Sequence, residues 1–130
     1  MKKSITYTYH HMGIPTDKKH SEERYSPVYK MYSTDGNNPF RIQWHRFESD
    51  SPLHPLLKNK PHVAFKVDNL DEALIGETVI LEPYYPLKNF RVAAIEVDGV
   101  PIELIETTLS EKDIWETDNK QGSNLYPNED

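Results

Sequence analysis

The sequence predicts a single α+β domain that consists mainly of β-strands and is built from two repeated halves. Short runs of β-branched and aromatic residues, separated by proline, glycine, asparagine and aspartate, indicate strands along most of the chain. A repeated motif indicates the two halves, because 11–17 (HMGIPTD) matches 62–68 (HVAFKVD) as histidine, apolar, small, apolar, two variable residues and aspartate. At 130 residues the chain is long enough for one core but not for two.

The strands are connected mainly by turns, and helices are few. Asp35-Gly36 and Asp98-Gly99 are hairpin signals, because glycine adopts the positive φ that a tight reversal requires. Short helices are expected at 17–25 and 69–75, the second with Asp68 or Asn69 as its N-cap. Strands are expected at 5–14, 27–33, 39–47, 61–67, 78–82, 90–97 and 101–107.

These elements divide the chain into a domain over 1–107 and a polar C-terminal tail over 108–130. The halves of the domain span about 5–48 and 61–107. The segment between them is rich in proline, serine and lysine, as expected of a connector.

Composition excludes several classes of function. The net charge is −6 and the basic residues are dispersed, so nucleic acid is not expected as a partner. No apolar run approaches the roughly 20 residues of a membrane span. Cysteine is absent, which removes disulfides, thiolate metal sites and cysteine nucleophiles. We therefore expect a soluble, cytoplasmic protein.

Each half carries one imidazole and one oxygen donor in matching positions. After the repeated histidine, Ile-Gln-Trp at 42–44 in the first half is matched by Ile-Glu-Leu at 102–104 in the second. If the halves pack about a pseudo-twofold axis, the four donors converge on one point, as metal binding requires. The predicted ligands are His11, Gln43, His62 and Glu103, a set that suits Zn, Ni, Co, Fe or Mn.

Side chains alternate along a strand, so residues two apart share a face. Tyr7 and Tyr9 are therefore expected on the face of His11, where they would bind substrate or only pack. Arg41 is expected in the same role, or as a surface charge. His45 shares a face with Gln43, and it is predicted either to bind substrate or to replace Gln43 as a ligand.

The chain resembles the vicinal oxygen chelate superfamily, which includes glyoxalase I, methylmalonyl-CoA epimerase, extradiol dioxygenases and bleomycin resistance proteins. The resemblance covers about 5–107 and is carried by HHMGIPT at 10–16, PHVAFKVDNLDEAL at 61–74 and VAAIEVDGVPIELIE at 92–106. It implies the glyoxalase-like fold, in which two βαβββ modules form a curved, cup-shaped mixed sheet around a divalent metal. The family's ligands carry over to His11, Gln43, His62 and Glu103.

The resemblance implies a metal-dependent lyase or isomerase of glyoxalase type, which acts on a 2-oxo or enolisable small molecule through a metal-bound enolate or oxyanion. Glu103 is the expected catalytic residue, with Glu96 or Glu82 as other candidate bases. One alternative is an Fe(II) extradiol-type dioxygenase, and another is a metal-free module that binds a ligand as bleomycin resistance proteins do. A homodimer is expected.

Overall fold

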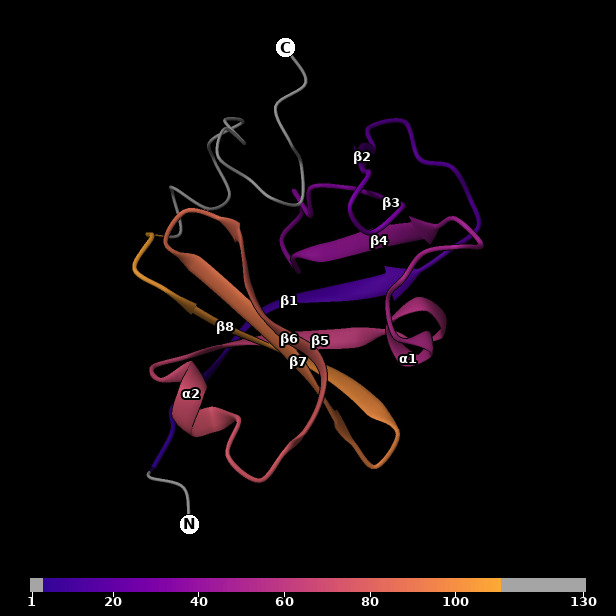
Figure 1. Cartoon of the computed structure of the whole chain (residues 1–130). Helices are drawn as coiled ribbons and strands as arrows, with labels where there is room; N and C mark the ends of the chain where they lie inside the picture. Colours follow the sequence, from indigo (N-terminus) through magenta and orange to yellow (C-terminus); the bar gives the residue numbers. More distant parts are fainter. Residues whose placement is uncertain (1–3, 111–130) are drawn as a thin grey trace.

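A computed structural model of the protein describes residues 4–110, so most of the predicted tail, 111–130, lies outside the described residues. The chain forms one curled, mixed sheet with the strand order β2-β3-β4-β1-β5-β8-β7-β6 and two short helices (Figure 1). This architecture agrees with the predicted cup-shaped α+β fold. The elements are β1 (Tyr7–Pro15), β2 (Arg24–Ser26), β3 (Met31–Ser33), β4 (Ile42–Phe47), α1 (Pro55–Asn59), β5 (His62–Val67), α2 (Leu70–Ala73), β6 (Thr78–Leu87), β7 (Phe90–Val97) and β8 (Val100–Thr107).

The middle of the sheet is formed by β4, β1, β5 and β8. β1 runs parallel to β4 and β5 runs parallel to β8, while β1 and β5 pair antiparallel between them. The strands farther out pair antiparallel. The order β1-β4-β3-β2 in the first half of the chain is therefore the same as the order β5-β8-β7-β6 in the second half.

Apolar residues pack on both faces of the second half of the sheet. On the outer face, Leu70 and Ala73 of α2 are completely buried against Leu104 and neighbouring side chains. Asn69 caps this helix, because its side chain accepts a hydrogen bond from the Glu72 backbone N–H. A second cluster lies on the inner face and consists of Ala64, Phe90, Val92 and Ile105, with Tyr84 packed against it.

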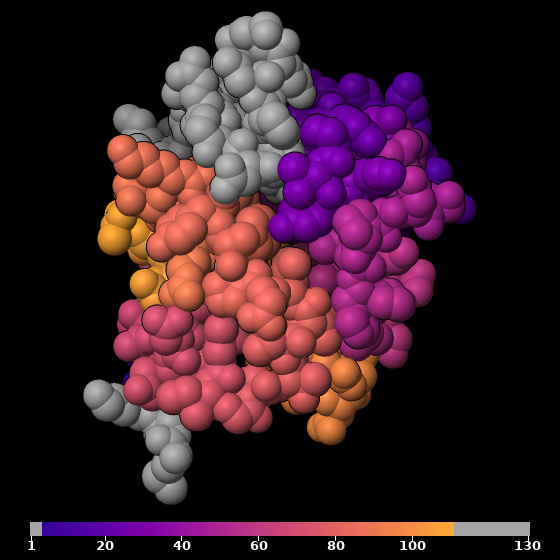
Figure 2. All heavy atoms as spheres, in the orientation of Figure 1, coloured from indigo at the N-terminus to yellow at the C-terminus, as the bar shows by residue number. Residues whose placement is uncertain are grey.

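One ring contact joins the segment before β3 to β6 on the inner side of the curled sheet. The rings of Tyr29, which precedes β3, and Tyr84 of β6 lie 5.5 Å apart in an edge-to-face arrangement. In the space-filling view, atoms of the first half adjoin atoms of the second half on the visible face (Figure 2). The curl of the sheet therefore brings part of the first half of the chain close to β6.

One of the two predicted hairpin turns forms as expected, and the other lies within a longer loop. Asp98 and Gly99 have φ of 50° and 83° and join β7 to β8 directly, as the sequence predicts. Asp35-Gly36 lies instead in a longer loop over 34–41, in which Gly36 has φ of 73°. The Asn38 side chain organises this loop by accepting hydrogen bonds from the backbone N–H groups of Phe40 and Ile42.

The helix expected at 17–25 is wrong, because β2 occupies the end of that segment and bends and irregular backbone precede it. The Glu23 carboxylate accepts hydrogen bonds of 2.7 and 3.1 Å from Arg46 of β4, and this tertiary contact prevails over weak local helix propensity. The connector, in turn, contains α1, whose Leu57 is buried. None of the helices in the described part of the chain is long and apolar enough to cross a membrane.

Candidate metal centre

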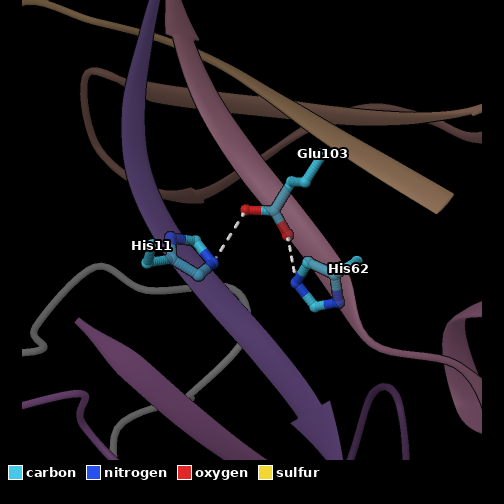
Figure 3. A group of neighbouring side chains, drawn as sticks. All are labelled: His11, His62 and Glu103. Carbon is cyan, nitrogen blue, oxygen red and sulfur yellow. Dashed lines mark ion pairs between the residues drawn. The ribbon is translucent and has the colours of Figure 1, made fainter. Parts of the chain in front are cut away.

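Three donor side chains meet on the inner face at the middle of the sheet. His11 lies on β1, His62 on β5 and Glu103 on β8 (Figure 3). The Nε2 atom of His11 is 3.4 Å from Glu103 Oε2, and that of His62 is 3.4 Å from Glu103 Oε1. One ligand atom from each residue lies within 4.8 Å of the other two.

Strand register brings these donors together. Ala64 of β5 pairs with His11 on one side and with Glu103 on the other, so the three side chains share a face. His62 lies two residues before Ala64 and points to the same face. Gly13↔Gln43 in the first half and Ala64↔Glu103 in the second are equivalent pairs of the two parallel ladders.

Burial and neighbouring charges set the protonation states of His11 and Glu103. Burial lowers the pKa of His11 to about 4, because removal from water disfavours the imidazolium, and the opposing attraction of Glu103 does not restore it. Burial alone would raise the pKa of Glu103, but His11 and His62 outweigh it and hold that pKa well below its usual range. At neutral pH the site therefore holds a neutral His11 beside a carboxylate, which are the ligand forms that bind metals.

The donor set fits a divalent transition metal. His11 and His62 are buried, with exposed fractions of 6% and 8%. Although His62 Nε2 lies 3.4 Å from Glu103, it has no hydrogen bond of good geometry within residues 4–110. Because two imidazoles and a carboxylate suit Fe, Zn, Ni, Co or Mn, these three residues can hold such an ion.

Gly13 provides the space in which the imidazoles lie. It pairs with His62 across the β1–β5 ladder, and a Cβ atom on Gly13 would lie 2.6 Å from His62 Nε2 and 2.8 Å from His45 Nε2. Real Cβ atoms do not approach other atoms that closely. Glycine at this position is therefore required by the packing of the two rings.

A β-bulge in β1 places a further histidine beside the site. Tyr9 pairs with Phe65 and His11 with Ala64, which leaves His10 as the additional residue. The Nδ1 atoms of His10 and His11 are 2.8 Å apart, and the His10 ring packs edge-to-face on Phe90 at 5.7 Å. His10 is not among the residues predicted from the sequence, because alternation along a strand places it on the face opposite to His11.

The same bulge overturns the predicted placement of Tyr7 and Tyr9. Both pair with residues of the outer face, and the Tyr7 ring lies 6.3 Å from that of Phe65. The expectation that they share a face with His11 is therefore wrong, because one extra residue reverses the alternation.

The other three predicted residues lie on β4 or directly before it. Arg41 lies before β4 with φ of 54°, and its Nη1 donates a hydrogen bond to the Gly36 carbonyl. Gln43 pairs with Gly13. Its Cγ packs on Gly36, 2.8 Å from the position that a Cβ atom would take there. His45 is buried, and its Nδ1 is 2.7 Å from the Ser33 hydroxyl, a contact that the sequence analysis missed.

The two additional candidate bases differ in their positions. Glu96 on β7 is half-buried and pairs with Pro101, two residues along the ladder from Ala94↔Glu103, so it faces the same side as Glu103. Glu82 on β6 is exposed.

Comparison with solved structures supports the fold. The chain is similar to the crystal structure of the hypothetical protein BH1468 from Bacillus halodurans C-125, with a TM-score of 0.54 and 16% sequence identity over 83% of this chain and 98% of that chain. No protein-family model matches the sequence. No curated protein matches it either. At 16% identity the likeness bears on the fold alone, and it is compatible with a glyoxalase-like curled sheet.

Proposed function

We propose that this protein is a metal-dependent lyase or isomerase of glyoxalase type that acts on a 2-oxo or enolisable small molecule. The observation that carries the proposal is the convergence of His11, His62 and Glu103 on the inner face of a curled mixed sheet. The equal strand order and the equivalent parallel ladders of the two halves support a duplicated βαβββ-like architecture in which the first module has lost its helix.

In this proposal His11, His62 and Glu103 hold a divalent ion, and Gln43 or His45 is the further donor. A bound ion supplies Lewis-acid polarisation of a substrate carbonyl. An imidazole carries no charge when it binds a metal, and Glu103 is the single carboxylate of the set, so a centre with a divalent ion would keep a net positive charge. The inner cluster around Phe90 and Val92 provides an apolar wall beside it.

A proton acceptor is also needed, because enolisation removes a proton next to the carbonyl. Glu103 is one candidate, since it is already ionised at the centre. Glu96 is the other, because it lies on the same face two ladder positions away. We assign Glu82 no role, since it is exposed.

An Fe(II) dioxygenase of the extradiol type is the second candidate function. It is favoured by one specific observation, namely that the converging residues are two histidines and one carboxylate, the triad of non-haem Fe(II) oxygenases. A metal-free binding module remains the third alternative, and it would make no use of these donors.

The first test is the metal content of protein purified without chelator, followed by thermal melting with Zn, Ni, Co, Mn and anaerobic Fe(II). We expect a bound ion and a rise in Tm, because a ligand of the native state stabilises it. The double variant H62A/E103A should lose both effects, while H20Q, which changes a histidine outside the site, should keep them. Wild-type protein that contains no metal and ignores all five ions would refute the proposal.

The second test separates the chemistries. A lyase or isomerase is expected to exchange the hydrogen on the carbon next to the carbonyl of small 2-oxo acids for solvent deuterium. NMR measures this exchange. Oxygen consumption with catechols would support the dioxygenase instead. A rise in Tm with aromatic or cationic organic compounds alone would support the binding module.

A further inference from the structure

His45 is a buried histidine whose role the three-donor site leaves open. It lies on β4 with an exposed fraction of 7%, and its Nε2 atom has no hydrogen-bond partner among the residues that the structure describes. We propose that His45 is the fourth metal donor, in the place predicted for Gln43, and that Ser33 holds its ring in position. This inference rests on the proposed metal-dependent function.

The position of the ring supports the assignment. His45 lies on the same face of β4 as Gln43, and its ring is stacked on that of His62, with centroids 5.6 Å apart and an angle of 18° between the planes. The Nε2 atoms of both rings lie within 2.8 Å of one point, which is the position that a Cβ atom would take on Gly13. Both nitrogen atoms therefore face the same small volume, which only glycine leaves open.

The hydrogen bond to Ser33 explains why the ring points that way. Ser33 on β3 pairs directly with His45, and its hydroxyl, itself on a residue only 2% exposed, lies 2.7 Å from His45 Nδ1. With Nδ1 engaged, Nε2 is the nitrogen that faces the space beside Gly13 and His62. Metal-binding histidines commonly have such a partner on the other ring nitrogen, because it fixes the orientation of the ring.

An unpaired buried nitrogen is unfavourable, so it points to a missing partner. A metal ion would accept the Nε2 lone pair and remove this cost. Gln43 is in a different situation, because its side chain packs on Gly36 in the loop over 34–41. The proposed set is three imidazoles and one carboxylate, which favours Zn, Ni, Cu or Fe(II) over Mn or Mg.

The test counts the nitrogen ligands. Cu(II) is loaded into the wild type, H45F and Q43A, and pulsed EPR counts the coordinated imidazoles, while competition with a chromophoric chelator gives the Zn(II) affinity. Phenylalanine retains an aromatic ring to stack on His62 but offers no donor. We expect H45F to lose one imidazole and at least about tenfold in Zn(II) affinity, and Q43A to lose neither.

Ser33 provides a second measurement. S33A should weaken Zn(II) binding about tenfold, and S33T, which keeps the hydroxyl, should restore it. If H45F fails to fold, H45L, which also offers no donor, is measured in the same way. Equal imidazole counts and affinities in the wild type and the His45 variant would overturn this inference and leave the proposed function standing. Wild-type protein that binds neither ion would overturn both.

Discussion

The Nδ1 atoms of His10 and His11 lie 2.8 Å apart, although side chains of adjacent residues in a regular strand point to opposite faces. The bulge in β1 makes this contact, because it turns both rings toward the inner face. His10 is in turn held by Phe90. His11 is thus supported at Nδ1 while its Nε2 faces Glu103, which makes His10 a positioning residue for the proposed centre.

Replacing His10 should therefore weaken metal binding without direct loss of a ligand. In H10F the ring can still pack on Phe90, but the contact to His11 Nδ1 is gone. We expect the Zn(II) dissociation constant to rise about tenfold, the usual effect of removing a partner of a metal-binding histidine. Chelator competition measures it.

The control for H10F is H10N, because its side-chain amide retains a hydrogen-bonding group close to His11. It should recover part of the lost affinity. If H10F and the wild type bind Zn(II) equally, the contact between the two rings has no positioning role, and His10 only fills space beside Phe90.

Gly13 is expected to tolerate no side chain. In G13A the new Cβ would meet the His62 and His45 rings, so both must shift, at a cost of about 1–3 kcal/mol in the free energy of unfolding. Zn(II) affinity should fall as well, because His62 moves. Urea unfolding and chelator competition measure the two effects.

Gly76 is the matched control for this substitution. It has φ of 76°, and a Cβ atom there would meet nothing within 4 Å. G76A should therefore lower stability by about 1 kcal/mol through backbone strain and leave Zn(II) affinity unchanged. A stable G13A protein with wild-type affinity would contradict the packing argument.

The curled sheet and the central donors could be predicted because they depend on patterns with a fixed period. The repeated motif places His11 and His62 on the two antiparallel central strands, and the Ile-Gln-Trp and Ile-Glu-Leu runs fall in their parallel partners. The turn at Asp98-Gly99 could also be predicted, because a two-residue turn with positive φ depends only on local sequence.

The features that were not predicted depend on contacts between distant segments or on one extra residue. A prediction that assumes strictly alternating side chains cannot detect the bulge at His10. It therefore placed Tyr9 on the wrong face. The contact between Ser33 and His45 requires the pairing of β3 with β4, which no short motif reports. The missing helix over 17–25 reflects the contact between Glu23 and Arg46, residues 23 positions apart.

The metal-free protein should lose stability in mild acid. In the native state the pKa values of His11 and His45 are lowered to about 4 and about 3, mainly because both rings are buried. In the unfolded chain both return to 6.5. Below pH 6.5 the unfolded chain therefore binds protons that the native protein does not, and the free energy of unfolding falls as pH decreases.

The fall should approach about 1.4 kcal/mol per pH unit for each histidine, and it should begin near pH 6.5. Glu103 does not contribute in this range, because its lowered pKa affects stability only below its ordinary value of 4.5. Urea midpoints measured with chelator should be constant from pH 8.5 to 7.5 and decrease from pH 6.5 to 5. H45F, which lacks one of the two groups, should show about half the decrease, and a flat wild-type profile between pH 6.5 and 5 would show that the rings are not buried in their neutral form.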